Sequence, residues 1–140
     1  MALVIDASII VRWYFRDEAN PRDDVLRRLG SETAVVPSHW EAEVANGVII
    51  GERRKRSHLA DVSRLVDLIS DLDREVDGEG AATALARLLP LARAHRLTVY
   101  DAQYLELAER RGLPLATFDR NLATAAHSVG VEVLGWELGQ

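Results

Sequence analysis

The residues of this chain that can carry chemistry are acids, and three of them come directly after apolar segments. A short apolar run bounded by polar residues is typical of a strand buried on both faces of a parallel sheet. In an open parallel sheet, ligands bind in the crevice outside the carboxyl ends of the strands. The apolar runs and the acids that end them are 3–5 with Asp6, 97–100 with Asp101, and 113–118 with Asp119.

A fourth acid, Glu43, lies near the start of a helix that is expected to follow another strand. Clustered carboxylates repel one another, which raises the pKa of one or more of them, and a divalent cation offsets that cost. Oxygen ligands without cysteine suit Mg²⁺ or Mn²⁺, and Mg²⁺ keeps several waters and contacts the phosphate of its substrate. The four acids together therefore predict a metal site that acts on a phosphate-bearing molecule.

Helix capping is the competing explanation for the aspartates. Asp6, Asp101 and Asp119 each precede an expected helix, and aspartate is a favoured N-cap residue. Capping is a sufficient explanation for any one of these aspartates, but a weaker explanation for all three together. Ser, Thr and Asn are also good caps, yet all three positions are acidic.

The glutamates of the helix expected over 38–54 receive different interpretations. Ser38 and Glu41 match a capping box, which predicts a structural role for Glu41. Glu43 has no such local role, and Asn46 lies one helical turn beyond it. Glu43 is therefore the better candidate for the site.

Other reaction types lack their residues. The absence of cysteine excludes disulfides and thiolate chemistry, and no nucleophilic triad or phosphate-binding glycine loop is present. A phosphoacceptor receiver needs a lysine after a late strand, whereas the single lysine is Lys55; an aspartyl phosphatase needs an acid where this chain has Ser8. The four histidines share no metal-ligand spacing, and we expect most of them on the surface or in loops: His39, His58, His95 and His127.

The elements that must position the acids alternate between strands and helices. This order predicts an α/β fold, with a parallel sheet covered on both faces, in a single domain over 1–140. Pro90 predicts a kink or a junction of two helices within 81–95. The other expected strands are 33–36, 75–76 and 131–134, and the other expected helices are 8–15, 22–29, 38–54, a helix reaching Ile69, 101–111 ended by Gly112, and 121–128.

Two surface features have alternative interpretations. Trp13, Tyr14 and Phe15 belong either to the core or to a docking surface. A basic run at the end of the helix over 38–54 either complements the helix dipole or contacts phosphates. Its residues are Arg53, Arg54, Lys55 and Arg56.

Composition limits the compartment and the partners. Apolar residues make up 48% of the chain, and no apolar run is long enough to span a bilayer, so we expect no membrane association. A net charge of −5 argues weakly against a general nucleic-acid binder. This argument loses force if several acids bind one metal ion, because the ion offsets their charge. Without cysteine or a signal peptide, a cytoplasmic location is expected.

Four segments resemble the PIN-domain ribonuclease toxins of the VapC type. They are VIDASIIVRWYF (4–15), HWEAEVAN (39–46), LTVYDAQYLELAERRGLPLATFDRNL (97–122) and GVEVL (130–134), and they occur in the family's order over nearly the whole chain. By this resemblance, Asp6, Glu43, Asp101 and Asp119 match the family's acids. Ser8, Asn46 and Thr117 match its polar helper residues.

The resemblance implies a three-layer α/β/α sandwich on a mainly parallel sheet. It also implies metal-dependent cleavage of RNA, a cognate antitoxin as partner, and a homodimer. We expect hydrolysis by a metal-activated water, with Asp6 and Asp101 as the first candidates for metal ligands and Glu43 and Asp119 completing the site. The alternative is a PIN-like module that binds RNA or a partner without cleaving it.

Overall fold

The computed structural model describes residues 1–15, 24–54, 62–78 and 80–135. A five-stranded sheet forms its centre, in the order β3-β2-β1-β4-β5, and every neighbouring pair is parallel. The strands are β1 (Ala2–Ile5), β2 (Thr33–Pro37), β3 (Arg74–Asp77), β4 (Leu115–Thr117) and β5 (Val133–Gly135). The predicted parallel sheet is confirmed.

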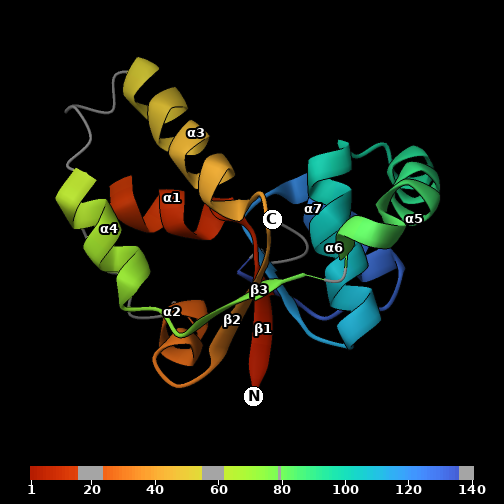
Figure 1. Cartoon of the computed structure of the whole chain (residues 1–140), viewed down its shortest axis with the longest axis horizontal. Helices are drawn as coiled ribbons and strands as arrows, with labels where there is room; N and C mark the ends of the chain where they lie inside the picture. Colours follow the sequence, from red (N-terminus) through yellow and green to blue (C-terminus); the bar gives the residue numbers. More distant parts are fainter. Residues whose placement is uncertain (16–23, 55–61, 79, 136–140) are drawn as a thin grey trace.

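Helices cover both faces of the sheet. They are α1 (Ala7–Phe15), α2 (Asp24–Leu29), α3 (Trp40–Arg53), α4 (Val62–Ser70), α5 (Gly80–His95), α6 (Val99–Arg111) and α7 (Arg120–Ser128). Helices α1, α3 and α4 lie on one side of the strands, and α5, α6 and α7 lie on the other (Figure 1). The molecule is a three-layer α/β/α sandwich, as predicted. No helix in the described ranges is long and apolar enough to cross a membrane.

The central strand β1 is buried along all of its length except Ala2. Leu3, Val4 and Ile5 have no exposed surface, which confirms the prediction for residues 3–5. Strands β2 and β3 follow β1 toward one edge of the sheet, whereas β4 and β5 lie toward the other edge. The strand order therefore changes direction between β1 and β4. Open α/β sheets bind their ligands at such a switch point, outside the carboxyl ends of the strands. The fold therefore places the residues after β1 and β4 at the expected binding edge.

Helix α1 packs closely against α3. A Cβ atom on Gly47 would come within 2.6 Å of Val11 Cγ2, and a Cβ atom on Gly51 would overlap the ring of Phe15. The two helices approach this closely because glycine occupies both positions. Trp13 and Tyr14 are buried, which confirms the core interpretation for these two aromatic residues.

The predicted strand over 97–100 is wrong. Leu97 and Thr98 lead directly into α6, and the Thr98 side chain accepts a hydrogen bond from the Asp101 backbone N–H at 3.1 Å. Thr98 is therefore the N-cap, and Asp101 lies in the first turn of the helix. The β-branched residues of this run resemble a strand, but the capping hydroxyl selects a helix start.

The predicted capping box is wrong. Ser38 and Glu41 form none, because α3 begins at Trp40 after His39 and no side chain caps it. Of the two alternatives for residues 81–95, the junction of two helices is wrong, because α5 continues through Pro90 as one helix. Gly112 ends α6 in the left-handed conformation, with φ of 64°, as predicted. Predictions that fall on 16–23 or 55–61 lie outside the described residues.

An ion network ties α6 to the edge strand β3. Arg110 Nη2 lies 2.6 Å from Asp77 Oδ2, and Arg111 Nη2 lies 3.0 Å from Asp77 Oδ1. Burial alone raises the pKa of Asp77, but hydrogen bonds from both arginines bring it below its ordinary value. Because Asp101 belongs to α6, this network also holds one of the candidate acids in place.

Candidate active site

Asp6 occupies the centre of the predicted crevice. It directly follows β1, is 4% exposed, and accepts hydrogen bonds on both oxygens. Ser8 donates from its backbone N–H and its hydroxyl to Oδ1, at 3.1 and 2.5 Å, and Thr117 donates to Oδ2 at 2.5 Å. Burial raises the pKa of Asp6 to about 7, helped by Asp101 and Asp119 and opposed by the two hydroxyls.

Thr117 and Ser8 connect Asp6 to the end of β4. The Thr117 hydroxyl also accepts from the Asp119 backbone N–H at 2.9 Å, and Ser8 Oγ accepts from the Phe118 N–H at 2.9 Å. Ser8 and Thr117, named as polar helpers from the sequence, both hydrogen-bond to Asp6; their role in a reaction stays a prediction. Together the two hydroxyls join the carboxyl ends of β1 and β4.

Asp119 follows β4 and also caps α7. Its Oδ1 accepts from the Leu122 backbone N–H at 3.0 Å, so the capping explanation is correct for this residue. Within the described residues, Oδ2 has no hydrogen-bond partner. One carboxylate can therefore cap the helix through one oxygen and offer the other to the crevice.

Asp101 reaches the same crevice from the first turn of α6. Burial raises its pKa to about 6, and repulsion by Asp119 and Glu43 adds to the shift. Asp101 also raises the pKa of Asp6. Asp101 thus interacts electrostatically with each of the other three acids, and Asp6 interacts with Asp119, although the four come from two strand ends and two helices.

Glu43 is held by two residues that the sequence analysis missed. Tyr104 OH donates to Glu43 Oε1 at 2.9 Å, and His39 Nε2 lies 2.6 Å from the same oxygen. Burial and the nearby Glu43 raise the pKa of the Tyr104 phenol, so it keeps its proton and remains a donor. The available signal was spacing: Tyr104 lies one helical turn beyond Asp101, and His39 one turn before Glu43.

The remaining predicted residues lie farther from this cluster. Glu41 is exposed and pairs with Arg74 at 2.8 Å, which supports the choice of Glu43. Asn46 is exposed on α3, one turn beyond Glu43. Arg53 and Arg54 are exposed at the far end of α3, while Lys55 and Arg56 lie outside the described residues.

The donor set suits a hard cation that keeps part of its water shell. Four carboxylates share the crevice, and the pKa values of two of them are raised by burial and mutual repulsion. In the described part of the chain, no three acidic or histidine side chains are arranged to enclose a metal ion. Mg²⁺ is usually held by one or two carboxylates together with waters and substrate phosphates, and needs no such enclosure. The residues fit that mode of binding.

Comparison with known proteins agrees with this architecture. A family model described as "PIN domain" matches residues 3–128. Ribonuclease VapC3 of Pyrobaculum aerophilum is 33% identical over 125 residues, which cover 88% of this chain and 93% of the relative. Ribonuclease VapC12 of Mycobacterium tuberculosis is 32% identical over 133 residues, covering 94% of this chain and 98% of the relative.

A solved structure agrees as well. The crystal structure of PAE2754 from Pyrobaculum aerophilum superposes with a TM-score of 0.66 at 25% identity, covering 96% of this chain and 84% of that one. The family match spans most of the chain, and both relatives exceed 30% identity over most of their own length. The chain therefore belongs to the PIN-domain family and is of the VapC type.

Proposed function

We propose that this protein is a metal-dependent endoribonuclease that acts as the toxin of a toxin–antitoxin pair. The observation that carries the proposal is the electrostatic coupling of Asp6, Glu43, Asp101 and Asp119 at the switch point of the sheet. A cluster of acids with raised pKa values favours binding of a divalent cation, which in turn attracts a phosphodiester. The ribonuclease names of the relatives support RNA as the substrate.

In this mechanism Asp6 and Asp101 would hold a Mg²⁺ or Mn²⁺ ion, with Glu43 and Asp119 completing the site. When bound, the ion supplies positive charge that offsets the phosphate and lowers the pKa of the attacking water. Ser8 and Thr117 fix the plane of the Asp6 carboxylate through hydrogen bonds to both oxygens. Tyr104 holds Glu43 toward the crevice, where its carboxylate can orient a water.

The test is cleavage of a labelled single-stranded RNA by the purified full chain. We expect cleavage with Mg²⁺ or Mn²⁺ and none after addition of EDTA. Asp6→Asn, Asp101→Asn and Asp119→Asn are each expected to lose most of the activity. Cleavage that persists in EDTA, or in Asp6→Asn, would contradict the proposal.

Glu43 and Glu41 form a matched pair for this test, since they lie two residues apart on one helix. Glu43→Gln removes the carboxylate held by Tyr104, whereas Glu41→Gln only breaks an exposed pair with Arg74. We expect the first variant to be inactive and the second to keep wild-type activity. The reverse result would mean that α3 presents its other glutamate to the substrate.

The alternative is a PIN-like module that binds RNA without cleaving it. The intact set of four acids favours the enzyme, because a binding module has no need for mutually repelling carboxylates. RNA binding without metal-dependent cleavage, in a preparation with the wild-type melting temperature, would favour the alternative.

The toxin role adds two partners to the proposal, a cognate antitoxin and a second copy of the chain. Expression of the wild-type chain should arrest growth, whereas Asp6→Asn should not, and co-expression of the antitoxin should restore growth. Light scattering of the purified protein measures whether it is a dimer. A cytoplasmic location also remains a prediction.

A further inference from the structure

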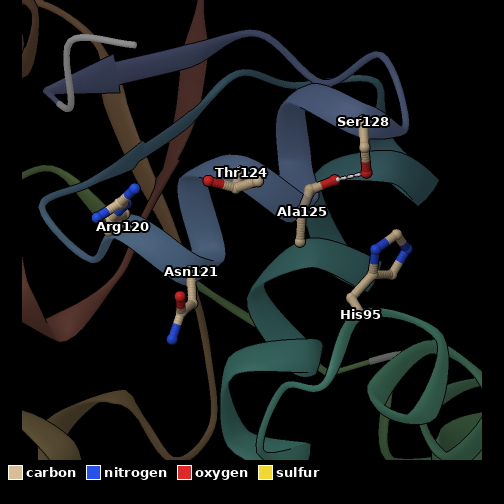
Figure 2. A pocket seen from close by; sticks show the side chains of 6 residues that line it. All are labelled: His95, Arg120, Asn121, Thr124, Ala125 and Ser128. Carbon is tan, nitrogen blue, oxygen red and sulfur yellow. Dashed lines mark hydrogen bonds between the residues drawn. The ribbon is translucent and has the colours of Figure 1, made fainter. Parts of the chain in front are cut away.

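A polar pocket opens between α7 and the end of α5. Its volume is about 390 Å³, within the range of about 300–1,000 Å³ that is usual for ligand pockets. Figure 2 shows the lining side chains, most of which belong to one face of α7. They are His95, Arg120, Asn121, Thr124, Ala125 and Ser128.

The pocket begins one residue after Asp119, an acid of the candidate active site. Arg120 directly follows Asp119, and His95 closes the helix that precedes Thr98 and Asp101. From Asn121 to Ser128 the α7 face extends about 10 Å, at 1.5 Å per residue. A pocket of this length that starts next to Asp119 is within reach of a nucleotide adjacent to one bound at the acids.

The charge of the pocket is opposite to that of the crevice. Arg120 is exposed, and among the described residues its guanidinium has no ion pair or hydrogen bond. No acidic side chain of the described chain lines the pocket, whereas three other hollows contain Glu109, Glu75 and Asp77. An unpaired arginine in a protein of net charge −5 is well placed to bind a phosphate directly.

The other lining groups suit a sugar or a base. Asn121 and Thr124 are exposed and have no side-chain hydrogen bond within the described residues. Ser128 donates to the Ala125 carbonyl at 2.7 Å, which leaves its oxygen free to accept (Figure 2). Ala125 is 4% exposed and too small to fill the space above it.

We propose that this pocket binds one nucleotide of the RNA next to the scissile phosphodiester. Arg120 contacts the flanking phosphate, and Asn121, Thr124 and His95 contact its sugar or base. The inference rests on the proposed ribonuclease function and extends it. The acids need a cation before they can accept the scissile phosphate. Arg120 in the pocket binds the neighbouring phosphate directly, without a cation.

The experiment measures steady-state cleavage of a labelled single-stranded RNA by the full chain with Mn²⁺. Arg120→Gln removes the phosphate contact, and Thr124→Phe fills the pocket from an exposed position. Arg120→Gln should raise KM about tenfold, the effect of one lost hydrogen bond to a charged group, and Thr124→Phe should also raise KM because its ring occupies the pocket. Because both residues bind and do not react, kcat should stay within about twofold of wild type. The matched control is Arg27→Gln, which removes the same charge from an exposed side chain of α2, away from α5 and α7 (Figure 1).

An unchanged KM in both pocket variants, or an equal rise in Arg27→Gln, would overturn the proposal. Thermal melting checks that each variant is folded. If wild type cleaves no RNA, the ribonuclease function fails by itself, and anisotropy with the same RNA in EDTA then tests the pocket. Even in that case, weaker RNA binding by Arg120→Gln than by wild type supports the pocket. Equal binding by wild type, Arg120→Gln and Thr124→Phe rejects it, and so does the absence of any RNA binding.

Discussion

At the scale of single residues, the hydroxyl of Thr117 has the most connected position in the site. It is fully buried, donates to Asp6 and accepts from the Asp119 backbone N–H, so one atom links two of the four acids. Ser8 makes the corresponding link from the other side, between Asp6 and Phe118. These hydroxyls lower the pKa of Asp6 against the larger effect of burial.

We therefore expect Thr117→Val, which keeps the shape and removes the hydroxyl, to affect stability and pH dependence together. The unpaired buried groups that remain should cost about 1–3 kcal/mol of unfolding free energy. The pKa of Asp6, already raised to about 7, should rise further, so metal-dependent activity should require a higher pH. Melting curves and a pH–rate profile measure the two effects.

Thr117→Ser is the matched variant, because it keeps the hydroxyl. It should retain the wild-type pH profile despite a loss of packing. If Thr117→Val shifts the profile no more than Thr117→Ser does, Thr117 acts through packing and not through its hydrogen bonds.

At the scale of elements, the contact between α1 and α3 sets the position of Glu43. Gly47 lies one turn beyond Glu43, and its missing Cβ makes room for Val11. Alanine is normally favoured over glycine inside a helix by about 1 kcal/mol. Here the added Cβ would come within 2.6 Å of Val11 Cγ2, so the closeness of the helices opposes that preference.

Gly47→Ala should accordingly destabilise the wild-type protein and stabilise the Val11→Ala protein. A double-mutant cycle on unfolding free energies, with the four proteins measured side by side, isolates the clash from helix propensity. A coupling energy near zero would mean that α1 and α3 separate at no cost.

The far end of α3 carries Arg53 and Arg54, which are exposed and are the described part of the basic run. If they contact RNA phosphates, Arg53→Gln with Arg54→Gln should reduce the log–log salt dependence of RNA binding by about 0.7 for each lost contact. Arg27→Gln serves as the control for loss of charge alone. An unchanged slope assigns both arginines to the helix end, where they complement its dipole.

At the scale of the whole molecule, the acid cluster links folding, pH and metal. Asp6 and Asp101 have folded pKa values of about 7 and about 6, against 3.8 as the ordinary value. The folded protein therefore binds more protons than the unfolded chain between these values. The contribution of these two groups to the metal-free unfolding free energy should therefore be highest below pH 4. It should fall as the pH rises toward 7.

Asp101→Asn should raise the metal-free melting temperature at pH 8, because it removes one of the repelling charges. The gain should be of the order of 1–2 kcal/mol, since partial exposure weakens the repulsion. A cation that binds only the folded wild type at a hundredfold excess over its Kd should add about 2.7 kcal/mol. That gain corresponds to roughly 5–10 °C in Tm.

The measurement is thermal melting of wild type and Asp101→Asn, each in EDTA and in Mn²⁺. Asp101→Asn should show a smaller gain from Mn²⁺ than wild type. The exposed Asp67→Asn, on α4, is the control and should leave both quantities unchanged. Equal melting temperatures in all conditions would contradict a metal site at this crevice.

The sequence by itself determined the layered fold and indicated which acids to consider together as a site. Some signals are local, because they can be recognised from a residue and its neighbours in the sequence. They include the apolar run 3–5, the aspartate after it, and the glycine that ends α6. The pattern EVAN favours Glu43 over Glu41 by resemblance, whereas the capping role expected for Glu41 is absent from the structure, so the choice of Glu43 stays a prediction. The four acids are also electrostatically coupled in the structure.

Only the tertiary structure decided how those acids are held. Residues 97–100 looked like a strand because local propensity does not show that Thr98 caps a helix. Tyr104 and Glu43 form a hydrogen bond although they are 61 residues apart in the sequence. The pocket of Arg120 and His95 likewise needs α5 and α7 side by side. Chain-distant contacts of this kind depend on how helices pack across the sheet, which no stretch of sequence encodes by itself.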